Sequence, residues 1–591
     1  MTKRHLASQT IVPWFRFRAA TALVETVRQG YSLRDFRADV LAGILVGVIA
    51  LPLSMALAIA TGVPPQYGLY TAIVAGTVIA FFGGSRVQVS GPTAAFVVIL
   101  VPIVTQHGLA GLAVATVMAG LIQIILALSR LGRLIQFVPH PVTIGFTAGI
   151  AVVIATLQMK DFFGLSIESM PDSYIERVTT LASAMPSFRW PDLVVGAACL
   201  AILIGWDHVT RKVPAALVAL TVCGVGAYVA HMAWGDGFVV ETIRGRFGSE
   251  ALPHGIPQKP PLFDLPWRFH RPGEADTGMT WGALFLLCKE LVPAAFAIAM
   301  LGSIESLLSA VVADGMSGHS HDPDSELFAQ GLGNIAAPFF GGFAATGAIA
   351  RTAANIRFGA RSPVSAIVHA QFVLVSMLLL APLLGHLPMA ALAALLLRVA
   401  WNMSEARHFI HTIRVAPRSD VAVLLTCFGL TVIFDMVIAV SVGVVLAAML
   451  FMRRMAEVAN VRFMQEKHHA ITEPLPPGVL VYEIAGPMFF GAAQRAMSAF
   501  RTIGNGVKAV ILDMESVPVM DATGLVNLEG AIDRLGRTQI TVILAGVQRQ
   551  PHGVMERGEL FEDRPHLLTC STMHEAVQIA RRIVQGEQPT G

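Results

Sequence analysis

The chain has 591 residues, of which 54% are hydrophobic and only 14% are charged. Soluble proteins carry roughly 25% charged residues, so most of this chain is expected to face lipid rather than water. The net charge of +3 and the lack of a basic stripe interleaved with aromatic residues argue against a nucleic-acid partner. The five cysteines include no CxxC pair, which argues against a disulfide framework and a metal site.

The first 38 residues are polar and basic, which predicts a cytoplasmic N-terminal arm and no cleavable signal peptide. Residues 39–454 form the predicted transmembrane domain. A spanning helix needs about 20 apolar residues, and several of the apolar segments are too short to span alone. About 14 segments, in two groups of seven, lie near 40–60, 66–82, 93–106, 109–129, 142–158, 192–206, 213–230, 282–312, 327–341, 348–356, 364–384, 387–402, 420–434 and 436–452.

Loop charges predict the orientation, because cytoplasmic loops carry an excess of Lys and Arg. An N-terminus on the inside places most of these basic residues in inner loops. We therefore expect a multi-pass protein of the cell membrane, in a bacterium the inner membrane, with both termini in the cytoplasm. The basic residues of the predicted inner loops are Arg130, Arg133, Arg211, Lys212, Arg357, Arg361, Arg407, Arg414, Arg418, Arg453 and Arg454.

The last part of the chain, residues 455–591, has a different pattern. Short buried strands are predicted at 478–485, 507–513 and 540–544, and amphipathic helices at 491–502 and 524–535. Alternating strands and helices are typical of an α/β domain, and the charged fraction rises here as expected for a surface in water.

Two of the apolar segments are interrupted in the same way. Ser90-Gly91-Pro92-Thr93 and Thr346-Gly347-Ala348-Ile349 each place small, extended residues and a hydroxyl directly before a short helix. Irregular backbone at membrane depth is tolerated only where it lines a cavity. Interrupted helices at corresponding places in two halves are the best sequence indication of a transporter's binding site.

The chemistry of such breaks favours an anion. Each short helix begins with N–H groups that have no intrahelical acceptor, and its dipole is positive at that end. Two such ends can hold a carboxylate or a sulfate without a metal or another cofactor. Arg351, one turn into the second short helix, would add a full positive charge. The alternative is that the glycines only allow close helix packing and that Arg351 reaches an inner headgroup.

Glu305 is the single acid of a long apolar stretch in the eighth segment. Ionisable residues inside membrane segments are costly and usually functional. We expect Glu305 to bind and release a proton that offsets part of the substrate's charge; the alternative is a carboxylate that only supports helix packing. His319, His321, Asp322 and Asp324 could suggest a metal site, but a solvated turn explains them more simply.

At these residues the chain resembles the SulP anion transporter family, which includes the animal solute carrier family 26. The resemblance extends over about residues 35–580, and some stretches, such as 91–100 and 397–406, are similar to C4-dicarboxylate transporters of that family. The motifs that carry it are Pro64–Tyr70, Gly83–Arg86, Val89–Ala94, Asn334–Gly342 and Phe434–Gly443.

The resemblance implies a polytopic α-helical fold with a 7+7 inverted repeat. Segments 1–4 and 8–11 would form a core domain that moves against a gate domain of segments 5–7 and 12–14. The substrate would lie between the third and tenth segments. Ser54 matches a motif that lines the same pocket, whereas Leu53 replaces a glutamine of many members. Glu305 matches an acid linked to proton coupling.

The C-terminal region resembles a STAS domain, whose marker here is Asp521-Ala522-Thr523-Gly524. In the related bacterial antagonists the residue after this Asp is a phosphorylated Ser. Ala522 has no hydroxyl, so a phosphoryl switch at that position is excluded, and Thr523 is a weaker candidate. The resemblance implies that the domain holds a homodimer together or binds a cytoplasmic protein.

Three functions remain open at this point. The first is proton-coupled uptake of C4-dicarboxylates such as succinate by alternating access. The second is transport of sulfate or bicarbonate. The third is a membrane sensor that binds an anion without transporting it. An enzyme is not expected, because no nucleophile–base pair, phosphate loop or metal cluster stands out.

Overall fold

The computed structural model divides the chain into two compact units, Met1–Val444 and Val445–Gly591. The residues that the structure describes are 19–132, 139–167, 170–171, 173–210, 213–250, 252–268, 281–434, 436–458, 460–464, 475–489, 506–562 and 564–586.

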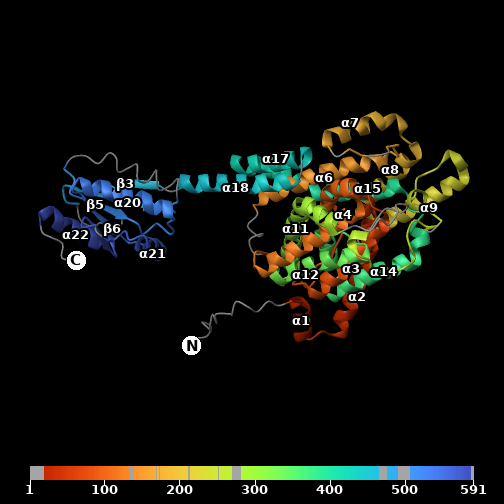
Figure 1. Ribbon diagram of the computed structural model, residues 1–591, viewed down its shortest axis with the longest axis horizontal. Coiled ribbons are helices and arrows are strands. Elements are labelled where there is room, and N and C mark those ends of the chain that lie inside the picture. Colours follow the sequence, from red (N-terminus) through yellow and green to blue (C-terminus); the bar gives the residue numbers. More distant parts are fainter. Residues whose placement is uncertain are drawn as a thin grey trace. The chain divides into compact units, whose positions relative to one another are not determined.

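The first unit is almost entirely helical (Figure 1). Its α-helices, including one that continues past the unit boundary, are α1 (Thr21–Arg28), α2 (Leu33–Thr61), α3 (Pro65–Phe82), α4 (Ala94–Leu128), α6 (His140–Phe162), α7 (Tyr174–Ala184), α8 (Trp190–Val209), α9 (Ala215–Trp234), α10 (Ile243–Phe247), α11 (Trp281–Ser317), α12 (Pro323–Ala336), α13 (Ile349–Arg357), α14 (Val364–Leu384), α15 (Met389–Ser404), α16 (Ala406–Val415), α17 (Arg418–Ile433) and α18 (Met436–Val458). Two short strands, β1 (Ser90–Gly91) and β2 (Thr346–Gly347), complete it.

Each expected apolar segment coincides with a helix or with half of one. The third and fourth segments both lie in α4, which is broken at Gly108, where φ is 65°. Within the described residues, seven helices are long and apolar enough to cross a membrane, and an eighth span results if α7 and α8, bent by 116°, count as one. The expected short segments are short here too: α12 has 14 residues, α13 has 9, and α15 and α17 have 16 each.

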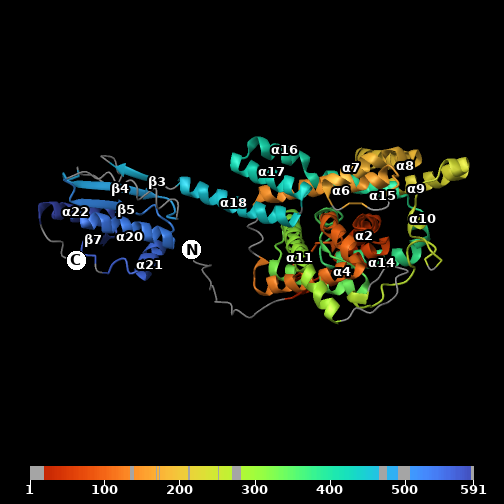
Figure 2. The same ribbon diagram turned by 45° about the horizontal axis from the view of Figure 1, so that its top comes forward.

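The helices of the first unit form two bundles. One bundle, the core bundle, contains α2, α3, α4, α11, α12, α13 and α14; the other, the gate bundle, contains α6, α8, α9, α15 and α17. Figure 2 shows α6, α8, α15 and α17 in one layer and α2, α4, α11 and α14 in another. Helices α2 and α4 contact α15 and α6 across the boundary between the bundles. The division agrees with the expected core and gate domains.

The packing partners repeat between the two halves of this unit. Helix α12 packs on α4, and its counterpart α3 packs on α14, the counterpart of the second half of α4. In the gate bundle, α6 packs on α17, and its counterpart α15 packs on α8. Exchanged partners of this kind are what an inverted repeat produces, since each contact occurs once in each orientation.

The second unit is an α/β domain. Its strands β3 (Asn460–Met464), β4 (Val479–Ala485), β5 (Ala509–Asp513), β6 (Thr541–Ala545) and β7 (Leu567–Cys570) form one sheet in this order. Strand β3 is antiparallel to β4, and the other neighbours are parallel. The helices are α20 (Ala522–Arg537), α21 (Arg549–Arg557) and α22 (Met573–Gln585). The expected helix at 491–502 lies outside the described residues.

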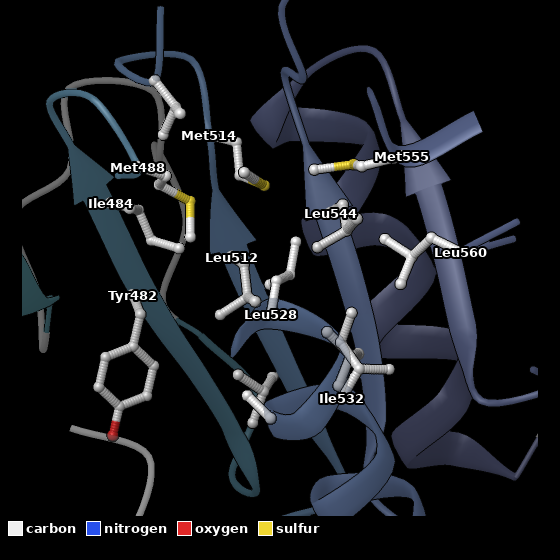
Figure 3. Packing of buried hydrophobic residues seen from close by; sticks show 14 of the residues in the cluster. Tyr482, Ile484, Met488, Leu512, Met514, Leu528, Ile532, Leu544, Met555 and Leu560 are labelled. Atoms are coloured by element: carbon white, nitrogen blue, oxygen red, sulfur yellow. The ribbon is translucent and has the colours of Figure 1, made fainter. Parts of the chain in front are cut away.

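Alternation along the strands explains how the sheet is covered. Tyr482, Leu512 and Leu544 point to one face and pack against Leu528 and Ile532 of α20 (Figure 3). The residues next to them in sequence point to the other face, where α22 packs. Successive strand side chains point to opposite faces, so a buried parallel sheet needs near-continuous apolar runs, which these strands have.

Candidate functional site

The structure brings the two interrupted segments together. Strands β1 and β2 pair antiparallel, with Ser90 opposite Gly347 and Gly91 opposite Thr346. The two strands therefore cross at the centre of the core bundle, although 255 residues separate Gly91 from Thr346 in the sequence (346 − 91). The pairing places the start of α4 beside the start of α13, because each helix begins within three residues of its strand.

Both helix starts have unsatisfied backbone donors. The residues that precede α4 and α13, Thr93 and Ala348, make no side-chain capping hydrogen bond. In α13 the first intrahelical bond comes from the N–H of Thr352 to the carbonyl of Ala348, 2.8 Å away. The N–H groups before it thus have no acceptor within the helix. Ile349, with 38% of its surface exposed, begins the open end of this helix.

Arg351 supplies a buried cation beside these donors. Its side chain is 3% exposed, and Nη2 donates to the carbonyl oxygen of Pro92 at 2.5 Å. Its Nε and Nη1 are buried and make no hydrogen bond to the described residues. A Cβ placed on Gly91 would lie 2.8 Å from Nη1, so this glycine allows the guanidinium to approach β1. Two free donors of a buried Arg are suited to an oxyanion.

Glu305 lies on the other side of the same helix starts. One of its carboxylate oxygens, Oε2, accepts a hydrogen bond of 3.0 Å from the hydroxyl of Thr93. Glu305 and Arg351 also attract each other electrostatically. The structure therefore brings together a half-buried acid, a buried guanidinium and two helix starts.

The hydroxyl groups of the two strands are used within the protein. Ser90 Oγ accepts from Gln330 Nε2 at 3.0 Å. Thr346 Oγ1 donates to the carbonyl of Gly302 at 3.0 Å and lies 2.7 Å from Ser306 Oγ. These side chains tie β1 to α12 and β2 to α11. Among the described residues, the donors left without a partner at the site are Nε and Nη1 of Arg351, beside two helix starts that have no side-chain cap.

Ser54 is buried in α2, and its hydroxyl has no hydrogen-bond partner among the described residues. Its carbonyl lies against Gly68 of α3, where a Cβ would come within 2.0 Å. No hydrogen bond within the described part of the chain joins Ser54 to β1 or β2. The structure shows Ser54 at the contact of α2 with α3.

The turn before α12 is held in part by hydrogen bonds. Asp322 caps the helix by accepting from the N–H groups of Asp324 and Ser325, at 3.1 and 3.2 Å. His321 Nδ1 lies 2.7 Å from Asp314 Oδ2. Among the described residues, no group of three or more potential ligands could hold a metal ion. His319 and Ser320 are exposed, as expected for a solvated turn, whereas Asp322 is half-buried and caps α12.

Three buried polar residues of α12 were missed by the sequence analysis: Glu326, Gln330 and Asn334. Gln330 joins Glu326 to Ser90. Their spacing of four residues, in a segment that is otherwise apolar or small, is the signal that could have found them, since it places them on one helix face.

The STAS marker forms a helix cap. Asp521 precedes α20, and its Oδ1 accepts from the N–H of Gly524 at 2.6 Å. Gly524 is required because a Cβ there would lie 2.3 Å from the carbonyl oxygen of Met488. Ala522 and Thr523 are exposed at the start of the helix.

Comparison with known proteins agrees with this geometry. The sulfate permease family matches residues 36–427, and the STAS domain matches residues 471–576. The chain is 40% identical to the putative sulfate transporter YvdB of Bacillus subtilis, over 90% of this chain and 96% of that protein. It is 28% identical to the bicarbonate transporter BicA of Picosynechococcus, over 93% and 95% of the two chains.

Solved structures show the same fold. Murine solute carrier 26 family member A9, an anion transporter in the inward-facing state, superimposes with a TM-score of 0.81 over 98% of this chain and 96% of that chain, at 18% identity. The transmembrane domain of a cyanobacterial BicA gives a TM-score of 0.57 over 71% of this chain and 98% of that chain, at 26% identity.

The family match, the relatives and the fold define a polytopic membrane protein of an anion-transporter class rather than an enzyme class. The chain belongs to the sulfate permease family and carries a C-terminal STAS domain.

Proposed function

We propose that this protein is a secondary active transporter that moves a small divalent oxyanion together with a proton. The observation that carries the proposal is the pairing of β1 with β2, which places two uncapped helix starts beside the buried guanidinium of Arg351. The N–H groups at the starts of α4 and α13 and the free donors of Arg351 would bind the anion. Gly91, Pro92, Thr93, Gly347, Ala348 and Ile349 supply the backbone of this cradle; Ser90 and Thr346 hold it in place.

The proton would be carried by Glu305. Its hydrogen bond to Thr93 connects the carboxyl group with the start of α4, so that a change in its charge acts directly on the anion. A protonated Glu305 leaves the positive charge of Arg351 uncompensated, which favours a dianion. Release of the proton restores the Glu305–Arg351 attraction and weakens anion binding, because the carboxylate then competes for the same cation.

Transport would proceed by movement of the core bundle against the gate bundle. The site lies entirely in the core bundle, on β1, β2, α4, α11 and α13, and the gate bundle contributes none of the residues named for it. A rigid displacement of one bundle against the other would therefore carry the closed cradle from one side of the membrane to the other.

Two dianions are supported as substrates. Sulfate is supported by the name of the 40% identical relative, a putative sulfate transporter. A C4-dicarboxylate such as succinate is supported by the resemblance of residues 91–100 and 397–406 to dicarboxylate carriers. Bicarbonate, which relatives of 28% identity are named for, carries one charge and would leave more of the cradle's positive charge uncompensated.

The remaining parts of the proposal concern the surroundings of the transporter. We infer that the protein lies in the cell membrane with both termini in the cytoplasm, since Arg361 lies in a connection predicted to be inside and Arg418 begins α17 directly after another such connection. The STAS domain would hold two copies together or bind a cytoplasmic protein.

Uptake by the full-length protein in lipid vesicles tests the proposal. Labelled sulfate is offered with an inward proton gradient, and unlabelled succinate, sulfate or bicarbonate competes. We expect uptake above the gradient-free rate and competition by one of the two dianions that exceeds competition by bicarbonate. Uptake that is independent of the proton gradient would exclude proton coupling. Binding of sulfate without any accumulation of sulfate, succinate or bicarbonate would indicate an anion sensor.

A further inference from the structure

A buried polar column on α12 contacts β1 and the residue before β2. Its members, Glu326, Gln330 and Asn334, are each at most 1% exposed and follow one another every four residues. They therefore lie on one face of the helix. Buried polar groups are costly unless they are hydrogen-bonded, so three in succession on a short membrane helix require a reason.

The first member holds the chain that leads into β1. Glu326 Oε2 accepts from the N–H groups of Gly84 and Ser85, at 3.0 and 3.2 Å. The same connection is held from the other side, because the N–H of Asp322 donates to the carbonyl of Gly84 at 3.2 Å. The segment before β1 is thus fixed to the start of α12 by three hydrogen bonds.

The second member, Gln330, connects Glu326 to β1 itself. Gln330 Nε2 donates to Glu326 Oε1 at 2.9 Å and to Ser90 Oγ at 3.0 Å. Both hydrogens of this amide are therefore used. The direction is set by the carboxylate, which only accepts; a rotated amide would place its oxygen against the oxygen of Glu326.

The third member holds the residue before β2. Asn334 Oδ1 accepts from the N–H of Ala345 at 2.7 Å, and Nδ2 donates to the carbonyl of the same residue at 3.1 Å. These two hydrogen bonds replace those that the backbone of a neighbouring strand would make. Nδ2 also donates to Gln123 Oε1 at 2.8 Å, which connects the column to the second half of α4.

We propose that the α12 column is the positioning element of the anion site: it sets the register of β1 against β2 and so directs the two helix starts at one ligand, with Glu326 as its anchor. The proposal rests on the proposed function and deepens it. The residues of the column touch the strands and none of the groups assigned to the ligand, so they are positioning residues. All three partners of Glu326 donate to it, so its two carboxyl oxygens act as acceptors.

Exchange of two residues separates positioning from proton transfer. In Glu326→Gln the new amide N–H meets the N–H of Gln330, and turning the Gln330 amide to accept from it leaves the Gln330 NH2 group buried at a position that has no partner. In the double variant Glu326→Gln/Gln330→Glu, Gln at 326 accepts from Gly84 and Ser85 and donates to Glu at 330, which in turn accepts from Ser90. Charge, volume and connectivity are all retained. Glu250→Gln, an exposed residue of the loop after α10, is the control for the loss of one charge.

Sulfate uptake by the full-length variants in vesicles is the first readout. We expect Glu326→Gln to raise the KM for sulfate by about tenfold or more, with a smaller change in maximal rate, because a buried donor left unpaired weakens the arrangement of the cradle. The double variant should return the KM to within about threefold of the wild type, as expected when satisfied hydrogen bonds are restored. A KM unchanged in Glu326→Gln, or a folded double variant no better than the single one, would overturn the proposal.

Hydrogen exchange of the segments 84–96 and 344–352, measured without any anion, is the second readout. It should accelerate in Glu326→Gln and slow again in the double variant. It decides the positioning role even if wild-type protein takes up no sulfate, a result that would count against the proposed function alone. Gln330→Met, which leaves Glu326 bonded to Gly84 and Ser85, serves if the single variant does not fold. Loss of proton dependence at an unchanged KM would instead identify Glu326 as a proton carrier.

Discussion

Arg351 is the buried cation beside the two helix starts, and in the proposed function it binds the anion. Arg351→Ala removes two free donors and the bond to Pro92. Hydrogen bonds to charged groups contribute about 1.5–3 kcal/mol, so the KM for sulfate should rise by roughly ten- to a hundredfold. Sulfate uptake in vesicles measures this KM. Arg357→Ala, in the exposed last turn of the same helix, is the control and should leave the KM unchanged. Equal effects of the two variants would show that the helix starts alone bind the anion.

Glu305→Gln should separate binding from coupling. Glutamine keeps the shape and can still accept from Thr93, so sulfate should still bind. It cannot carry a proton, so accumulation driven by an inward proton gradient should be lost, and the remaining exchange of sulfate should not respond to external pH. In the wild type, uptake should fall as the external pH is raised. Counterflow and gradient-driven uptake distinguish the two activities. Glu290→Gln, in an exposed position of the same helix, should keep both.

The residues of the site could be predicted only in part. The breaks at Ser90–Thr93 and Thr346–Ile349 were visible because glycine, proline and hydroxyl residues interrupt apolar runs. The direction of the side chains could not be predicted from the sequence. Ser90 and Thr346 are bonded to α12 and α11, and such partners depend on contacts between segments that are 40 or more residues apart in the sequence. For the same reason the α12 column was missed.

At the scale of the element, the crossing of β1 and β2 depends on a residue without a side chain. A Cβ on Gly347 would lie 2.0 Å from Gln88 Nε2 and 3.1 Å from the Cα of Ser306. Gly347→Ala should therefore separate the strands and lower sulfate uptake by at least about tenfold, since overpacking in a dense core costs about 1–3 kcal/mol. Gly429→Ala in α17 meets no atom within 4 Å and should transport normally. Normal uptake by Gly347→Ala would show that the crossing tolerates a shift.

The cap of α20 allows a test in the second unit. Asp521→Ala removes the acceptor for the N–H of Gly524 and should destabilise the domain by about 1 kcal/mol. Hydrogen exchange of α20 in the full-length protein should accelerate accordingly. Thr523→Ala, next to it and exposed, should have little effect. A larger effect of Thr523→Ala than of Asp521→Ala would show that the marker serves contacts with a partner rather than the cap.

Elements were predictable where one signal dominates. Hydropathy located the apolar segments, and apolar strands located β4, β5 and β6. Hydropathy did not distinguish α7 and α16 from loops, because these helices are apolar on one side only. The separation of the segments 93–106 and 109–129 agrees with the break of α4 at Gly108, where the backbone is not helical.

At the scale of the whole molecule, the two units follow from composition: one is apolar throughout and the other has the strands and charges of a domain in water. The exchange of packing partners, with α12 on α4 and α3 on α14, could not be predicted from the residues because it depends on contacts between distant segments. Only the matched breaks at β1 and β2 indicated the repeat, because each places an extended segment directly before a helix.

The orientation of the whole protein in the membrane is the last expectation that an experiment can decide. If the N-terminus is inside, the loop after α10 lies outside and the turn between α11 and α12 lies inside. Cysteine is introduced at Ser249 or at Ser320, both exposed, after Cys288 and Cys570 are replaced by Ser. A membrane-impermeant maleimide should label Ser249→Cys in intact cells and Ser320→Cys only after the membrane is opened. The reverse pattern would mean that loop charge misidentifies the inner face, and that the STAS domain lies on the side opposite to the one proposed, because an even number of spans keeps both termini together.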